Sequence, residues 1–151
     1  MADEITYRQK ILTVFFNILS AVDGVKNVEI DKTTLIDIDS VPMATCFIYA
    51  GPETRARDDK QVQGMETWVW HVLIELWAYK DTSTGGESIE IMLGRIHKAI
   101  NNNFWLDGYA RSVRRIGADQ KYFDLDGTRK AMVIPFEVVY SHTIGNMFIT
   151  T

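Results

Sequence analysis

Three histidines and several carboxylates are the side chains of this sequence that could bind a metal ion or transfer a proton. The histidines, His71, His97 and His142, are too scattered to reveal a metal site, and the HExxH, CxxC and GxxxxGK[ST] motifs are absent. His71 and Glu75 would share a strand face, but the strand rise separates them by roughly 13 Å. Because one metal ion cannot bridge that distance without a third element, we interpret His71 as a surface or interface histidine.

Two pairs of aspartates, Asp37 with Asp39 and Asp124 with Asp126, have the spacing of acids that hold a divalent cation or act in acid–base catalysis. They fall on short strands near turns, where such acids are usually solvated, and we interpret them as surface residues. A nuclease with a strand-borne Glu-x-Lys motif would need a lysine where this sequence has Trp77. A small metal-dependent nuclease therefore stays a distant alternative.

The sequence contains no recognisable activated nucleophile. No G-x-S-x-G motif occurs, and the single cysteine, Cys46, lies in an apolar strand-like run where a buried, inert thiol is expected. Arg111, Arg114 and Arg115 could contact phosphate, but in a net acidic chain we interpret them as a salt-bridging interface patch. We therefore predict a protein that is not an enzyme, without a catalytic centre, cofactor or metal site.

Length and composition predict one soluble globular domain. The 151 residues are 46% hydrophobic and 24% charged, with a net charge of −4, and a chain of this size buries about two-thirds of its unfolded surface. The acidic balance lacks the basic footprint of a nucleic-acid-binding protein. No apolar run is long enough to span a membrane. The opening MADEITYRQK lacks the pattern of a secretory signal, so an intracellular protein is expected.

We expect the stretch Met65–Lys80 to organise the fold. Its even positions, from Trp68 to Ala78, form an unbroken apolar row and its odd positions are mixed, which is the two-residue period of a strand. At about 3.4 Å per residue it would span roughly 50 Å, so it is either bent or bulged, or projects beyond its domain. On the odd face Trp77 and Tyr79 need a cover, for which a second subunit is one candidate.

Apolar spacings of three and four residues predict two amphipathic helices, over residues 4–22 and Glu87–Phe104. Further strands are expected as two short strands within Val25–Asp39, a central strand at Met43–Ala50, strand-like segments at Tyr109–Gly117 and Asp119–Leu125, and a last strand at Lys130–His142. This order predicts a single α+β domain over residues 1–151. It has a mainly antiparallel, twisted sheet with the two helices packed on one face.

Two segments are expected outside this core. Residues 51–64 are bounded by glycines and rich in charge, so they form either a flexible, solvated loop or an arm that orders against a partner. The second possibility assigns partner contacts to Arg55, Arg57, Asp58, Asp59 and Lys60. Residues 144–151 form an apolar tail with no obvious internal partner, which predicts a subunit contact that includes Phe148.

Nearly the whole chain resembles the tail-terminator, or tail-completion, proteins of long-tailed bacteriophages. The resemblance rests on an amphipathic first helix of the ILTVFFNIL type, a proline entering a strand at Val41–Ala44, a polar excursion, the aromatic strand Trp68–Tyr79, a helix after a glycine-containing turn, and a closing strand, Ile134–Tyr140. Other head–tail connector and minor tail proteins share much of this pattern and stay alternatives, as does a cellular α+β adaptor.

The resemblance implies a structural virion protein of the phage tail, assembled in the host cytoplasm, that forms a ring, usually a hexamer. Such a ring caps the tail tube, ends its polymerisation and offers a joint to the head–tail connector protein. In a closed ring every subunit uses two different patches, for which we predict Arg55–Lys60 and the face of Trp77 and Tyr79. An acidic chain would also suit a lumen through which DNA passes without specific binding.

Overall fold

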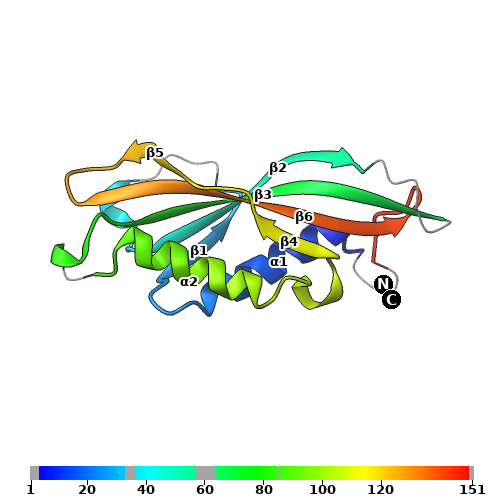
Figure 1. The fold of residues 1–151 in the computed structure, drawn as a ribbon, viewed down its shortest axis with the longest axis horizontal. Coiled ribbons are helices and arrows are strands. Elements are labelled where there is room, and N and C mark those ends of the chain that lie inside the picture. The colour runs from blue at the N-terminus through cyan, green and yellow to red at the C-terminus, as the bar shows by residue number, and fades with distance from the viewer. Residues whose placement is uncertain (1–3, 33–36, 57–63, 85, 150–151) are drawn as a thin grey trace.

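The computed structural model describes residues 4–32, 37–56, 64–84 and 86–149. In chain order its elements are α1 (Tyr7–Ser20), β1 (Asn27–Ile30), β2 (Thr45–Arg55), β3 (Met65–Tyr79), α2 (Ile89–Asn101), β4 (Ser112–Arg115), β5 (Asp119–Asp124) and β6 (Arg129–Thr143), with short 3-10 turns at Ile38–Ser40, Thr82–Thr84 and Leu106–Gly108. The molecule is elongated along β3 and β6, and both helices lie on the same side of the sheet (Figure 1).

Within the described residues six strands form one mixed sheet, in the order β1-β2-β3-β6-β4, with β5 also beside β6. β1 is parallel to β2, and the other pairs are antiparallel. The longest pairing joins β3 to β6 without interruption, from Met65 opposite Thr143 to Tyr79 opposite Arg129. The predicted α+β class with a mainly antiparallel sheet is thereby confirmed.

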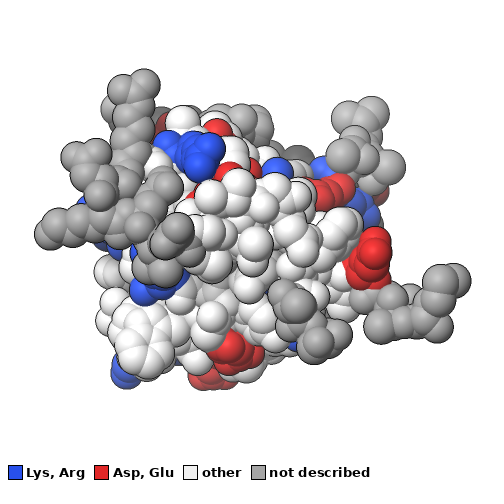
Figure 2. All heavy atoms as spheres, turned by 90° about the vertical axis from the view of Figure 1, so that its right-hand side faces the viewer, with Lys and Arg blue, Asp and Glu red and all other residues white. Residues whose placement is uncertain are grey.

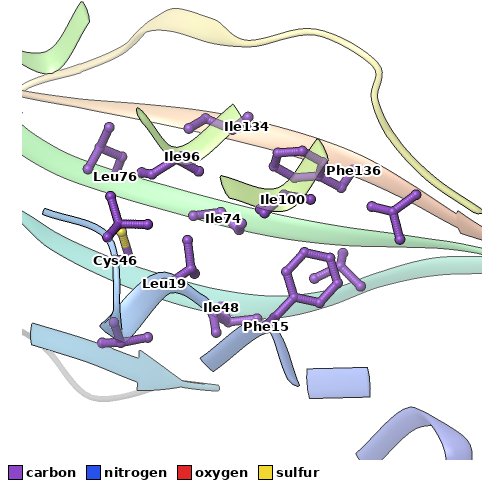
Figure 3. Close-up of a cluster of buried hydrophobic side chains, with 14 of the residues drawn as sticks. Phe15, Leu19, Cys46, Ile48, Ile74, Leu76, Ile96, Ile100, Ile134 and Phe136 are labelled. Carbon is purple, nitrogen blue, oxygen red and sulfur yellow. The ribbon is translucent and has the colours of Figure 1, made fainter. Parts of the chain in front are cut away.

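The helices bury the even row of β3, as the alternation of that strand predicts (Figure 3). Both helices and three strands contribute fully buried side chains to this layer, among them Phe15, Leu19, Ile96, Ile100, Cys46, Ile48, Ile74, Leu76, Ile134 and Phe136. Each large apolar side chain removed from water contributes about 1.5–3 kcal/mol to folding. This layer therefore supplies most of the hydrophobic stabilisation.

The first helix begins later than predicted, at Tyr7, because Thr6 caps it. The Thr6 hydroxyl accepts from the Gln9 amide (3.1 Å), and the Gln9 side chain accepts from the Thr6 amide (2.9 Å), which completes a capping box. Between Val25 and Asp39 only one strand is found, β1, instead of two; residues 33–36 lie outside the described part of the chain.

The loop expected over residues 51–64 starts later than predicted, because β2 continues through its first five residues. The register against β3 shifts between Ala50 and Glu53 and then resumes, as in a β-bulge. Gly51 fits this irregularity because a Cβ there would meet a β3 carbonyl oxygen at 2.7 Å. Because of the bulge, β2 continues through the Gly-Pro pair at which the sequence predicts that the strand ends. Residues 57–63 lie outside the described part.

The sheet face opposite the helices has a small core of its own. Phe47, Trp77 and Ala131 are buried there, and the rings of Phe47 and Trp77 meet edge to face at 5.3 Å. The Trp77 indole nitrogen donates to the Glu75 carboxylate at 2.8 Å. Partly buried neighbours pack around this cluster: Val41, Met43, Tyr49 and Leu125. The cover that Trp77 was expected to need, for which a second subunit was one candidate, therefore comes from the chain itself, which leaves Trp77 only 7% exposed.

Trp77→Ala should lower the free energy of unfolding by about 3–5 kcal/mol, because it opens a cavity between Phe47 and Ala131. Trp105→Ala is the matched control: Trp105 is 61% exposed, and its loss should cost at most about 0.5 kcal/mol. Urea denaturation at low protein concentration measures both values. Equal losses for the two variants would contradict the burial of Trp77.

Candidate interaction surface

Two of the acids singled out by spacing, Asp39 and Asp126, serve local structure. The Arg129 guanidinium binds Asp39 at 2.9 Å and Asp126 through its Nε at 2.6 Å. The same Asp126 carboxylate accepts from the backbone amides of Thr128 and Arg129 in the turn before β6. The hydrogen bond from Arg129, aided by these amides, holds the pKa of Asp126 well below its usual range. Among the described residues no group of three or more His, Cys, Asp or Glu could hold a metal ion.

The histidines lie in different environments. His71 is half-buried on the face away from the helices, opposite Glu137 of β6. His142 is only 4% exposed, and its Nδ1 lies 3.4 Å from the carboxylate of Glu66, which is itself buried. Residue spacing did not reveal this pair, because Glu66 and His142 face each other across one end of the β3–β6 ladder but are far apart in the chain.

Cys46 is a buried free thiol in the helix-facing layer, as predicted. Burial raises its pKa to about 12, because the thiolate would lose its hydration. At neutral pH the side chain therefore stays protonated and out of contact with solvent, and it behaves as a small apolar residue.

The charged arm is described only at its start. Arg55 ends β2 with its side chain half exposed, and its guanidinium lies 3.7 Å from the Glu66 carboxylate. The other residues predicted to make partner contacts, Arg57, Asp58, Asp59 and Lys60, lie outside the described residues. A contact through this arm stays a prediction.

The three arginines near β4 do not form one patch. Arg114 lies opposite Glu137 and pairs with it at 3.0 Å, whereas Arg115 lies opposite Phe136, whose side chain belongs to the helix-facing core. Because neighbouring residues of a strand point to opposite faces, the sheet separates these two side chains. Arg111 precedes the strand and is exposed. The salt-bridge interpretation is therefore confirmed for Arg114, and the idea of a single patch is wrong.

Tyr79 is half-buried at the end of β3 and also has a cover from its own chain. Gly86 lies so close to its ring that a Cβ there would meet two ring carbons at 2.2 Å. Tyr79 also forms a parallel bridge with Ser88, just before α2. The predicted interface of Trp77 and Tyr79 thus loses its physical reason, since both side chains find neighbours within the chain.

The C-terminal tail has an internal partner, contrary to the sequence-based expectation. Thr6 and Phe148 form an antiparallel bridge, the Tyr7 amide donates to the Met147 carbonyl at 3.0 Å, and the Ile149 amide donates to the Ile5 carbonyl at 2.9 Å. These bonds fasten the tail beside the start of α1, which brings both chain ends to one end of the molecule (Figure 1).

An aromatic and polar cluster lies near this attachment. The Tyr7 ring stacks on Tyr140 at 6.4 Å and lies 6.2 Å from the ring of His142. The Tyr140 hydroxyl donates to the Glu53 carboxylate at 2.5 Å. Burial, reinforced by that carboxylate, raises the pKa of Tyr140 well above its usual value. The Trp68 indole N–H is buried without a hydrogen-bond partner among the described residues.

The attached ends leave a group of exposed apolar side chains, which we call the apolar end face: Ile5, Ile144, Met147 and Phe148. Their exposed fractions lie between 36% and 53%. Figure 2 looks onto this end of the molecule and shows a central area without charged side chains, with acids and bases at its edge. Phe148 was a predicted contact residue, whereas Ile5 was missed because nothing in the sequence pairs the first residues with the last.

No protein-family model and no curated protein matches this chain in sequence. In the described part of the chain, no helix is long and apolar enough to cross a membrane.

Cys46 should resist thiol reagents in the folded protein at pH 8 and react promptly in urea, because only unfolding exposes it.

The raised pKa of Cys46 also predicts that the free energy of unfolding depends on pH. The unfolded thiol ionises from about pH 9 while the folded thiol stays protonated until about pH 12, so stability falls with rising pH in that window by up to about 1.4 kcal/mol per pH unit. Cys46→Ala should lack this component. Parallel pH curves of unfolding free energy for both proteins would contradict it.

Proposed function

We propose that this chain is a structural virion protein of the tail-terminator type. In this proposal it forms a closed homo-oligomeric ring, by analogy a hexamer, that caps the tail tube, ends tube polymerisation and carries the joint to the head–tail connector protein. The assignment includes no catalytic step and no cofactor. It places the protein in the phage tail after assembly in the host cytoplasm.

The apolar end face is the observation that carries this proposal. Isolated exposed apolar residues are ordinary on a protein surface, but several that are brought together at one end of a molecule are typical of an interaction site. Here Ile144, Met147 and Phe148 come from the tail and Ile5 from the chain start, and backbone hydrogen bonds hold the two segments together. The surface is therefore preorganised for a partner, which lowers the entropic cost of binding.

The position of this face suits a contact along the axis of a tail. It lies at one end of the long axis set by β3 and β6 (Figure 1), so a partner bound there leaves the flanks of the subunit free for its neighbours in a ring. Another head–tail connector protein could use the same surface, and what would distinguish a terminator is that its partner is the growing end of a tube. The net charge of −4 is also compatible with a lumen that does not bind DNA.

Electron microscopy of the purified protein, alone and with the tube protein of the same phage, tests the proposal. Rings of one size are expected from the protein alone. With polymerising tube protein, tubes should stop growing and carry a ring at one end. Sedimentation that shows a lasting monomer at all accessible concentrations would contradict the proposal, and rings that never join tubes would favour another connector.

Phe148→Asp should weaken tube capping about tenfold or more, since loss of a central apolar contact costs about 2 kcal/mol and the new carboxylate must also be desolvated. Ile91→Asp is the matched control, because Ile91 on α2 has the same exposed fraction, 41%. Both variants should retain the thermal stability of the parent protein. Capping is measured as the fraction of tubes that end in a ring; equal capping by Phe148→Asp would exclude the end face.

A further inference from the structure

An exposed aromatic pair, Phe104 and Trp105, follows the end of α2 at Asn101. The two side chains are 42% and 61% exposed, and their rings contact each other edge to face with centroids 5.0 Å apart. Trp105 is the most exposed large apolar side chain in the described part of the chain. Tryptophan is highly buried on average, so a tryptophan held largely in water beside a second ring indicates a binding surface.

The turn after this pair fixes its backbone. Leu106 and Asp107 have φ values of +45° and +57°, a region that residues other than glycine rarely occupy. The Leu106 side chain is nevertheless fully buried, and the amides of Gly108 and Ala110 both donate to the Trp105 carbonyl, at 2.9 and 3.1 Å. Trp105 therefore belongs to a defined turn rather than to a frayed helix end, and a ligand bound there would not have to order the backbone.

A hollow of about 290 Å³ lies at this turn, and its walls come from residues 102–108. Two polar side chains that line it, Asn102 and Asp107, have no hydrogen-bond partner among the described residues. Asn103 differs, because its side-chain amide donates to the Ala99 carbonyl at 2.7 Å. The hollow thus combines aromatic surface with a carboxylate that can only accept hydrogen bonds and an amide that can both donate and accept.

The polar groups limit what the hollow can bind. An apolar side chain of a partner would leave Asn102 and Asp107 without hydrogen bonds inside the contact, which costs free energy for each group. A nucleotide or another phosphate would meet the Asp107 carboxylate, and residues 102–108 include no Lys or Arg to offset that repulsion. Lys98 is exposed one helical turn before Asn102 but does not line the hollow.

We propose that this hollow binds a neutral pyranose residue of a carbohydrate. One face of a pyranose ring presents C–H groups, which stack on an aromatic face because that face carries partial negative charge. The hydroxyl groups at its rim can each donate and accept a hydrogen bond. The C–H face lies on the Trp105 indole in this arrangement, while hydroxyl groups donate to Asp107 and exchange hydrogen bonds with Asn102. The sugar thereby satisfies both polar side chains that an apolar partner would leave unpaired.

This inference goes beyond the proposed function and does not rest on it. The apolar end face consists of Ile5, Ile144, Met147 and Phe148, and such a surface suits an apolar protein partner. At the hollow, by contrast, the aromatic side chains have Asn102 and Asp107 beside them. The two surfaces therefore differ in the chemistry of the partner that each can accept.

An oligosaccharide array probed with the full chain tests the site. The array presents neutral oligosaccharides of glucose, galactose, mannose, rhamnose and N-acetylglucosamine, and the strongest binder is then titrated by isothermal calorimetry. Saturation-transfer NMR on that oligosaccharide should show protein contact with the C–H groups on one face of a single pyranose. An array on which no sugar is bound would overturn the proposal, as would tighter binding of a short single-stranded DNA than of every oligosaccharide.

Three substitutions locate the binding. Trp105→Ala should weaken it about tenfold or more, by comparison with bases stacked on aromatic side chains, and Trp105→Phe should restore part of the affinity. Asp107→Gly removes the acceptor without straining the turn, because glycine tolerates a positive φ, and should weaken binding several-fold. Ile91→Ala is the control, since Ile91 near the start of α2 is 41% exposed and its loss should leave the affinity unchanged.

Thermal unfolding of each variant verifies that the fold is kept. Affinity that survives Trp105→Ala, or that falls equally in Ile91→Ala, would overturn the proposed site. The outcome is independent of the ring. Rings that bind no sugar would refute this inference alone, whereas sugar binding through Trp105 by a protein that stays monomeric would support it and refute only the proposed function.

Discussion

The pairing of β3 with β6 is the constraint on which the rest of the structure depends. Its fifteen-residue strands extend roughly 50 Å at 3.4 Å per residue, whereas helices of fourteen and thirteen residues extend only about 20 Å at 1.5 Å per residue. Each helix is thus less than half as long as the ladder, and the two cover one face from opposite ends: α1 begins beside His142 and α2 begins beside Tyr79. The remaining parts of the chain have to cover the other face and complete both ends.

Each end of the ladder is closed in a different way. At one end Phe47, Trp77 and Ala131 form the small core on the face away from the helices, and Arg129 joins Asp39 to Asp126. At the other end, Tyr7 and the C-terminal tail cover part of β6, with Tyr140 and His142 stacked near Tyr7. The first closure is well buried, but the second leaves apolar side chains exposed. The asymmetry gives the molecule one closed end and one that suits a partner.

Local periodicity was enough to predict the layers of this fold. The two-residue alternation of β3 and β6 and the helical spacing of Phe15, Leu19, Ile96 and Ile100 are properties of short stretches, and they placed both helices on the correct face. The pairs that sequence reasoning missed are distant in the chain. Trp77 is covered by Phe47 and by Val41 and Met43, which lie some thirty residues earlier in the chain. Phe148 of the tail pairs with Thr6. A pattern within one segment carries no information about such partners.

The difference between local patterns and contacts between distant segments also explains which parts of the candidate surface were predictable. Phe148 was predicted as a contact residue because an apolar tail is unusual in any context. The predicted helix extended to Phe104 because its spacing continues the apolar row of α2, whereas the helix ends at Asn101 and leaves Phe104 42% exposed. Three asparagines before it, which weaken a helix end, were the one local signal that the helix stops early.

The surfaces left by this fold point in different directions, and that arrangement bears on how a ring could end a polymer. The apolar end face lies at one end of the long axis, and the two faces of the sheet run along that axis. In the proposed ring, contacts between neighbours along the flanks would therefore use surfaces distinct from the contact with the tube. A subunit that joins its neighbours in a closed circle and offers the axial face once would add to a tube a single time, which is the physical requirement for a terminator.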